Sequence, residues 1–212
     1  MSMSRMNRTS VCVVLSGLLI LGLSGVLQAA ETAGTTLENL QAAFNGESNA
    51  RARYLAFAQK ADEEGYGAVA SLFRAASKAE EIHANTHAQV IKSMGGVPKA
   101  DIQKAVVKTT RENLQAAIGG ESYERDTMYP AFIEVARKDK NKAALRTFNF
   151  AKGAETGHAK IYAEILAKLD SLKGSKKTDY QVCTECGYTV AQINFDKCPN
   201  CFEPISMYMV VN

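Results

Sequence analysis

The sequence predicts an all-α four-helix bundle followed by a small metal-binding module with little regular structure. Three observations predict this architecture. Four long stretches between residues 36 and 169 are rich in helix-forming residues, and four of the five cysteines crowd between residues 183 and 201. In addition, residues 36–48 match residues 110–122 at ten of thirteen positions. Such a repeat indicates two helical hairpins that pack as equivalent halves of one bundle.

The boundaries of the predicted parts follow from turn and linker signals. We expect an N-terminal segment at residues 1–30, the bundle at 31–170, a linker at 171–178 and a cysteine domain at 179–212. The four helices are expected at about residues 36–64, 68–94, 110–138 and 142–169. Pro130 lies inside the third helix, where a proline can kink the backbone.

Residues 1–30 have the composition of an export signal peptide. Arg5 and Arg8 precede the uncharged apolar run at residues 11–27, and small residues follow it. Two outcomes remain open: cleavage after Ala29, or retention of the segment as a membrane anchor. Both predict an exported, periplasmic protein. Cleavage would lower the net charge from +3 to +1, and a nearly neutral chain gives no support for nucleic-acid binding.

Two Glu-x-x-His motifs carry the candidate chemistry. Glu80 and His83 form the first, and Glu155 and His158 form the second, seventy-five positions later. Residues three apart lie on the same face of a helix, so each motif offers a carboxylate and an imidazole in one direction. The remaining histidine, His87, lies one turn after the first motif. We interpret it either as a residue at the rim of the site or as one that supports the ligands from behind, and not as a ligand.

Each motif is matched in height by a glutamate on the other helix of its hairpin. Residues equidistant from the turn of an antiparallel hairpin lie level, which pairs Glu47 with Glu80 and Glu121 with Glu155. At about 1.5 Å per residue they lie roughly 25 Å from the turn, in the middle of the bundle. Four carboxylates buried there would repel one another without cations. Oxygen-rich ligation with one imidazole per metal suits iron or manganese.

Glu124 breaks the symmetry between the two halves. It lies one helical turn after Glu121, whereas the equivalent position in the first half holds Ala50. Two interpretations stay open. The residue is either a seventh ligand, which would let one metal exchange partners between redox states, or a solvated side chain that pairs with Arg125 or Arg111.

The C-terminal cysteines form two Cys-x-x-Cys knuckles separated by eleven residues. The four are Cys183, Cys186, Cys198 and Cys201. Tetrahedral sulfur ligation suits zinc or iron, and the spacing alone does not discriminate between them. Because so short a module buries little surface, we expect the metal to supply much of its folding free energy, with Tyr188 and Phe195 as a small core.

The combined pattern resembles the rubrerythrin family over nearly everything after residue 35. The resemblance implies a ferritin-like bundle with a non-haem di-iron centre and a rubredoxin-type Fe(Cys)4 centre, or zinc at the cysteines. The di-iron ligands that it implies are Glu47, Glu80, His83, Glu121, Glu124, Glu155 and His158. Tyr54 and Tyr129 match family tyrosines that hydrogen-bond around the site, although by spacing alone they read as core aromatics.

The same resemblance implies a role for each di-iron ligand. Glu80 and Glu155 would bridge the irons, and Glu47 and Glu121 would be terminal ligands. His158 would hold one iron. The other iron would move between Glu124 when oxidised and His83 when reduced.

The activity implied by the resemblance is reduction of hydrogen peroxide to water, which protects against oxidative stress. Electrons would come from an external donor through the Fe(Cys)4 centre. We also expect a homodimer in which one subunit's module serves its partner's di-iron site. Two alternatives stay open: a ferritin-like ferroxidase that binds iron and carries structural zinc, and a purely structural zinc protein. Export departs from the usual cytoplasmic location of the family and leaves the donor open.

Overall fold

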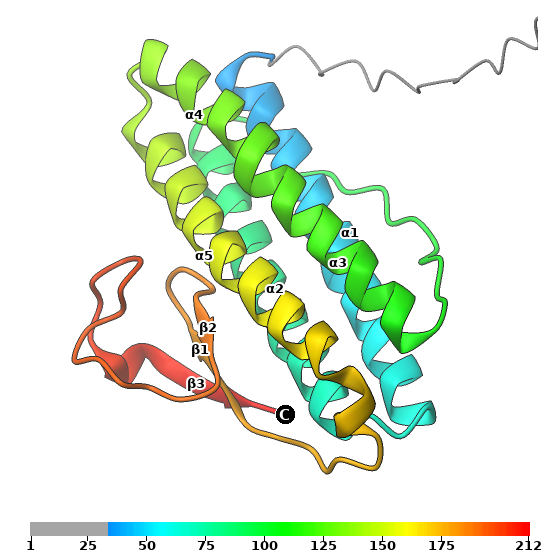
Figure 1. Cartoon of the computed structure of the whole chain (residues 1–212). Coiled ribbons are helices and arrows are strands. Elements are labelled where there is room, and N and C mark those ends of the chain that lie inside the picture. The colour runs from blue at the N-terminus through cyan, green and yellow to red at the C-terminus, as the bar shows by residue number, and fades with distance from the viewer. Residues whose placement is uncertain (1–33) are drawn as a thin grey trace, which may run out of the picture. The chain divides into compact units, whose positions relative to one another are not determined.

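Four long helices form an antiparallel bundle, and a small three-stranded sheet with its loops packs beside it (Figure 1). The computed structural model describes residues 34–212, so the predicted export segment lies outside the described residues. The first two helices are α1 (Thr36–Glu63) and α2 (Gly67–Ser93). The third consists of α3 (Thr110–Tyr123) and α4 (Tyr129–Lys138), and the fourth is α5 (Lys142–Ala167). This arrangement confirms the predicted fold class.

Helices α1 and α3 begin with the same capping arrangement. The side chain of Thr35 accepts a hydrogen bond from the backbone of Glu38, and the Glu38 side chain accepts one from the Thr35 backbone. Thr109 and Glu112 repeat these contacts at the start of α3. Such capping boxes satisfy backbone donors that a helix start leaves free. The sequence repeat therefore encodes the first turn of both hairpins.

The third predicted helix is interrupted by a π-helical turn, η1 (Glu124–Met128). Its hydrogen bond runs from the Tyr129 N–H to the carbonyl of Glu124, five residues earlier. The two halves are offset by 74 positions at the helix starts but by 75 at the Glu-x-x-His motifs, so the second half holds one extra residue. A π-helical turn accommodates one extra residue within a helix. The discontinuity thus precedes Pro130, which lies in the first turn of α4.

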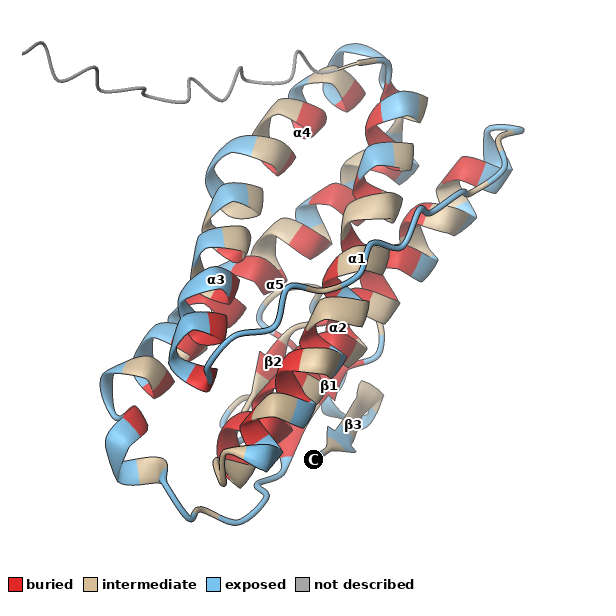
Figure 2. Ribbon diagram, turned by 90° about the vertical axis from the view of Figure 1, so that its right-hand side faces the viewer, coloured by how far each residue is buried: buried red, intermediate tan, exposed pale blue. Residues whose placement is uncertain are grey.

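The long connection between α2 and α3 crosses the outside of the bundle, where most of its residues are exposed (Figure 2). Two asparagines on α1 hold it. The side-chain oxygen of Asn45 accepts from the backbone N–H of Asp101 at 2.8 Å. Asn49 accepts from the N–H of Gln103 at 2.8 Å and donates to the carbonyl of Asp101 at 2.9 Å. The crossover joins the two hairpins without entering the core.

The cysteine module folds back along α2 of its own chain. Its strands are β1 (Tyr180–Cys183), β2 (Thr189–Val190) and β3 (Tyr208–Val211), paired antiparallel in the order β2-β1-β3. The linker is held at the start of α2, where Gly67 N–H donates to the carbonyl of Ser175 at 3.2 Å. The N–H of Thr178 donates to the Ser71 hydroxyl at 3.1 Å. These contacts direct the module toward the middle of the bundle.

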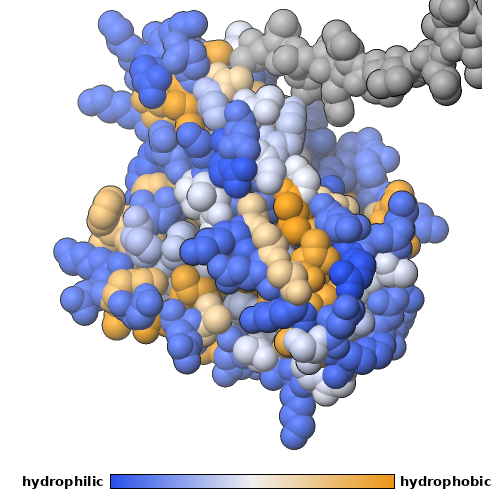
Figure 3. Space-filling model, in the orientation of Figure 1, coloured by the Kyte–Doolittle hydropathy of each residue, from blue (hydrophilic) through white to orange (hydrophobic). Residues whose placement is uncertain are grey.

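Two hydrophobic clusters fill the bundle on either side of its midpoint. One gathers around Tyr54, Phe73 and Tyr162, and the other around Tyr129 and Phe148. Among residues 34–212, no helix combines the length and apolarity needed to cross a membrane. The face in Figure 3 shows separate hydrophobic patches among hydrophilic side chains.

Candidate metal centre

Six of the predicted ligands meet in the middle of the bundle. Among residues 34–212 they form two overlapping groups in which ligand atoms lie within 4.8 Å of one another. The first group is Glu47, Glu80, His83 and Glu155, and the second is Glu80, Glu121, Glu155 and His158. All six residues are buried. Because Glu80 and Glu155 belong to both groups, they are placed to bridge two metal ions.

Each of the four carboxylates has one buried oxygen that accepts no hydrogen bond from the part of the chain that the structure describes. These atoms are Glu47 Oε2, Glu80 Oε1, Glu121 Oε2 and Glu155 Oε1. A buried acceptor without a partner is costly, and so is a buried cluster of like charges. Two divalent cations would balance four carboxylates and take up the orphaned oxygens. The residues therefore fit a pair of metal ions.

Backbone carbonyls of the cysteine module orient both histidines. Nε2 of His83 lies 3.0 Å from the carbonyl oxygen of Cys186, and Nε2 of His158 lies 3.3 Å from that of Gly187. A carbonyl only accepts, so Nε2 carries a hydrogen in both rings, and Nδ1 is the nitrogen left for a metal ion. In His83, Nδ1 lies 2.9 Å from oxygens of both Glu80 and Glu155. Each ring thus presents a metal-binding nitrogen to the carboxylates.

Two buried tyrosines hold the outer glutamates reciprocally across the hairpins. Tyr54 on α1 donates a hydrogen bond to Glu121 on α3, and Tyr129 on α4 donates one to Glu47 on α1. Burial raises the pKa of both phenols, so both remain donors at neutral pH. The tyrosines lie beside the site, as the resemblance implied, and each also packs in a hydrophobic cluster.

Electrostatics in the absence of metal show how unbalanced the carboxylates are. Burial raises the pKa of Glu47 and of Glu155 well above the usual value, and the charge of Glu80 adds to both shifts. Burial acts in the same direction on Glu121. Hydrogen bonds from Glu155 and His158 outweigh it there and lower the pKa to about 2. Glu121 therefore stays ionised without metal, whereas Glu47 and Glu155 hold their protons more strongly than free glutamates do.

The metal-free protein is expected to lose stability as the pH rises from about 6.5 to about 9. Burial alone would lower the pKa of His83, but a hydrogen bond with Glu80 outweighs it and raises the pKa to about 9. A group whose pKa is higher in the folded than in the unfolded protein stabilises the fold fully at pH values below its unfolded-state pKa. This contribution is lost as the pH rises through the folded-state pKa. The raised pKa values of Glu47 and Glu155 act in the same direction.

Thermal melting of chelator-treated and iron-loaded protein across this pH range checks the expectation. The melting temperature of the metal-free form should fall with pH, while that of the loaded form should change little because the metals keep the ligands deprotonated. A metal-free melting temperature that stays constant or rises would contradict the electrostatic account of the cluster.

Glu124 lies outside both groups of ligands. It is half-buried at the start of η1, and burial together with the charges of Glu47 and Glu121 raises its pKa. The arginines considered as its partners pair elsewhere, Arg125 with Asp126 and Arg111 with Asp170. Its ligand role stays a prediction. The arrangement seen here has His83, and not Glu124, beside Glu47.

His87 belongs to neither group of ligands, as expected, and it is fully buried. Of the two positions considered for it, His87 occupies the one behind the ligands and not the rim. Its Nε2 lies 3.1 Å from the Tyr129 hydroxyl, and its Nδ1 lies 3.0 Å from Oγ1 of Thr147. Burial lowers the pKa of His87 to about 3, and the charge of His83 adds to the shift. The imidazole is therefore neutral, with one donor nitrogen and one acceptor nitrogen.

The four C-terminal cysteines converge as a second metal site. Sγ of Cys183 lies 3.6 Å from that of Cys201, and Sγ of Cys186 lies 3.6 Å from that of Cys198. Metal–sulfur bonds of ~2.3 Å in a tetrahedron separate sulfurs by about 3.8 Å, close to this spacing. A hydrogen bond from Cys186 lowers the pKa of Cys183 to about 5, which favours the thiolate. The cluster fits either iron or zinc.

The first knuckle lies directly against the carboxylate site, a contact that the sequence did not reveal. A Cβ at Gly187, where φ is +75°, would lie 2.3 Å from Nε2 of His83. The second knuckle contacts α5, where the Asn200 side chain donates to the carbonyl of Phe150 at 2.8 Å beside Gly153. The resemblance implied that a partner subunit's module serves this site, whereas here the chain's own module reaches it.

A helical bundle with a carboxylate–histidine site for two metals, joined to a four-cysteine module, defines the di-iron proteins with a rubredoxin-like centre. The family model described as Rubrerythrin matches residues 38–166. The chain belongs to the rubrerythrin family. It therefore carries the residues of a di-iron site and of a rubredoxin-like centre for iron or zinc.

Relatives and solved structures agree with this assignment. The chain is 39% identical to nigerythrin of Nitratidesulfovibrio vulgaris over 81% of its length and 84% of that protein. It is 36% identical to rubrerythrin-2 of Clostridium acetobutylicum, over 78% of this chain and 91% of that protein. The structure of fully reduced, all-ferrous nigerythrin superposes with a TM-score of 0.78 at 35% identity, over 87% of this chain and 91% of that one.

Proposed function

We propose that this protein is an oxidoreductase that reduces hydrogen peroxide to water at the di-iron site, with electrons delivered through iron at the four cysteines. The observation that carries the proposal is the pair of hydrogen bonds between the two metal sites, from His83 to the Cys186 carbonyl and from His158 to the Gly187 carbonyl. A storage ferroxidase has no need of a sulfur site in contact with both histidines. A peroxidase that is re-reduced between turnovers does.

The balanced reaction is H2O2 + 2e⁻ + 2H⁺ → 2H2O. Two ferrous ions, when bound, supply both electrons to the peroxide. The chain's own residues do the rest: Glu80 and Glu155 hold the two metal positions together, and the tyrosines fix the outer carboxylates Glu47 and Glu121. Glutamates carry protons to the leaving water.

Glu124 has a separate part in the proposal. It exchanges with His83 as a ligand when the redox state changes, and the half-buried position at the start of a π-helical turn suits a side chain that moves. His83 lies beside Glu47, which is where the proposal needs it in the reduced state.

The compartment and the partners are part of the same proposal. The export segment directs the protein to the periplasm, so the electron donor is a redox protein on that side of the membrane. The chain forms a homodimer. Oxidative-stress protection follows from removal of peroxide in that compartment.

An anaerobic peroxide reaction tests the proposal. Fully reduced, iron-loaded protein mixed with one equivalent of hydrogen peroxide should oxidise its di-iron site at once, and the visible absorption of the sulfur-bound iron should then appear as electrons leave it. With a reductant present, this absorption should bleach and recover with each addition. Accumulation of an iron mineral under excess ferrous iron and oxygen, without a peroxide reaction, would favour the ferroxidase. Purified protein with zinc and no iron would favour the structural alternative.

A further inference from the structure

A line of hydrogen bonds leads from the di-iron site toward the surface between α2 and α5. It starts at Glu47, which accepts from the Tyr129 hydroxyl, and continues to Nε2 of His87 at 3.1 Å. On the far side of the ring, Nδ1 of His87 lies 3.0 Å from Oγ1 of Thr147. Oγ1 of Thr147 in turn lies 2.8 Å from that of Thr86. Every link between the carboxylate and the last hydroxyl is within hydrogen-bond distance.

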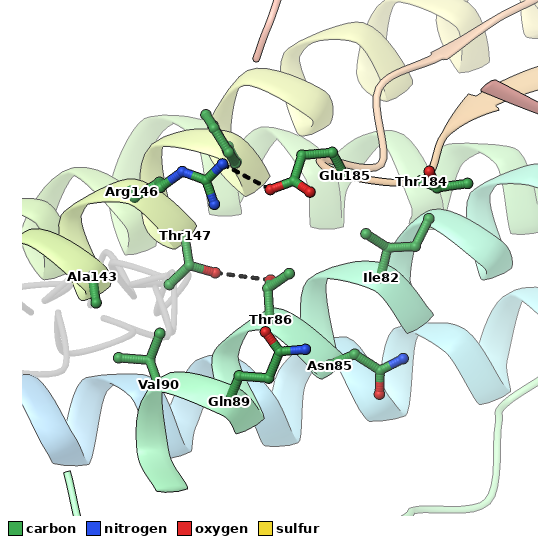
Figure 4. A pocket seen from close by; sticks show the side chains of 11 residues that line it. Ile82, Asn85, Thr86, Gln89, Val90, Ala143, Arg146, Thr147, Thr184 and Glu185 are labelled. Carbon is green, nitrogen blue, oxygen red and sulfur yellow. Dashed lines mark hydrogen bonds and ion pairs between the residues drawn. The ribbon is translucent and has the colours of Figure 1, made fainter. Parts of the chain in front are cut away.

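The outer end of this line opens into a cavity of about 370 Å3 that both polar and apolar side chains line (Figure 4). Thr86 and Thr147 face each other across it, and the exposed residue Gln89 lies at its edge. On the module side the wall is formed by Arg146 and Glu185, whose charged groups pair at 2.8 Å. A cavity of this size with several polar groups holds water. The Thr147 hydroxyl is therefore in reach of solvent, while the His87 ring behind it is fully buried.

The donors along the line can all point in one direction. A carboxylate that takes part in ligation only accepts, so the Tyr129 hydroxyl donates to Glu47 and its oxygen is left to accept. A neutral His87 then donates from Nε2 to Tyr129 and accepts at Nδ1 from Thr147. The Thr147 hydroxyl has two acceptors, Nδ1 of His87 and Oγ1 of Thr86, between which it can rotate. The line resets after each transfer when this rotation is joined by rotation of the Tyr129 hydroxyl and by reorientation of the His87 ring from the Nδ1–H to the Nε2–H tautomer.

We infer that Thr147, His87 and Tyr129 form a proton path from the cavity to Glu47. The inference rests on the proposed function, in which each peroxide consumes two protons inside a site enclosed by two hydrophobic clusters. Glu47 takes the proton of Tyr129, and Tyr129 takes one in turn from Nε2 of His87. Nδ1 of His87 then takes the proton of Thr147, and water in the cavity gives a proton to Thr147. One proton enters per passage, and no residue of the path keeps a charge. The two electrons would come from the two ferrous ions of the proposed function, which the sulfur-bound iron then re-reduces one electron at a time.

Variants at Thr147 test the path. Thr147→Val keeps the shape and removes the hydroxyl, whereas Thr147→Ser keeps the hydroxyl. Ser77→Ala is the matched control, because Ser77 is a buried hydroxyl on α2 that donates to the Arg51 carbonyl at 3.0 Å, away from the path. The first measurement is solvent exchange of the His87 ring N–H by NMR in protein loaded with zinc, which is diamagnetic and inert to peroxide. The second is the rate at which peroxide oxidises the reduced, iron-loaded protein.

We expect Thr147→Val to slow both the exchange and the peroxide oxidation by about tenfold or more, given that a positioned proton donor contributes ~100-fold. Thr147→Ser and Ser77→Ala should behave like the wild type, and metal content should not change. Exchange in Thr147→Val at the wild-type rate would overturn the path. If Thr147→Val does not fold, His87→Phe keeps an aromatic ring, and oxidation of that variant at the wild-type rate would overturn it. A wild-type protein that peroxide does not oxidise would refute the proposed function, and the exchange measurement would still decide the path.

Discussion

Replacement of Glu155 by glutamine is expected to have opposite effects on metal binding and on the stability of the metal-free protein. Glu155 belongs to both groups of ligands, and its neutral isostere removes the charge that two cations share. We expect the two carboxylate-bound irons to be lost and the sulfur-bound iron to remain. In the metal-free state, burial and the charge of Glu80 already disfavour an ionised Glu155. The variant should therefore gain about 1 kcal/mol or more in unfolding free energy.

Metal analysis and denaturant unfolding of the metal-free form measure the two effects. Glu164→Ala is the matched control, because Glu164 is an exposed glutamate on the same helix. Its one ion pair within residues 34–212, with Lys160, is 4.0 Å long. The control should keep all three metals and unfold like the wild type. Retention of three irons by Glu155→Gln, or a less stable metal-free variant, would refute the account of Glu155 as a shared ligand.

The carboxylate site could be predicted because its geometry is local. The spacing within each Glu-x-x-His motif fixes a helix face, and the turn of each hairpin fixes which glutamates lie level. Both quantities depend on short stretches of chain with regular periodicity. The arrangement of Glu47, Glu80, Glu121 and Glu155 therefore follows from the sequence once the helices are assigned.

The π-helical turn was missed although the sequence contained a signal for it. The halves differ in offset by one residue between Glu121 and Tyr129, and a continuous helix would have turned the tyrosine away from its counterpart's position. Pro130, where the sequence predicted a kink, lies after the actual break in the helix, which begins at Glu124. With η1 in place, Tyr54 and Tyr129 occupy equivalent positions and reach each other's glutamates.

Contacts between the module and the bundle could not be predicted from spacing. The hydrogen bonds named above join residues 29, 50 and 103 positions apart, and these contacts depend on glycines that leave room for a neighbour. Beside Gly153 lies the Asn200 side chain, and beside Gly157 lies the ring of Tyr188. The partners of His87 are also remote in the sequence, at 42 and 60 positions, so its spacing from His83 left open whether it lies at the rim or behind the ligands. Long-range packing decided these cases.

Replacement of Gly187 by alanine is expected to separate the two metal sites without removing either. The new Cβ would lie 2.3 Å from Nε2 of His83, so the knuckle must move off the histidine. We expect transfer of electrons from the sulfur-bound iron to the oxidised di-iron site to slow by about 100-fold, the size of effect that a misplacement of 1 Å can have. Stopped-flow absorption after one equivalent of peroxide measures this rate.

Gly95→Ala separates the strain of the backbone from the loss of contact. Gly95 also has a positive φ, +80°, but nothing lies within 4 Å of a Cβ built there. Alanine costs about 1 kcal/mol in such a left-handed conformation at either position. Only Gly187→Ala places an atom between the sites, so only that variant should show slow internal electron transfer. Equal rates in the two variants would mean that electrons reach the di-iron site by a route other than the contact between Cys186 and His83, for example from the module of a partner subunit.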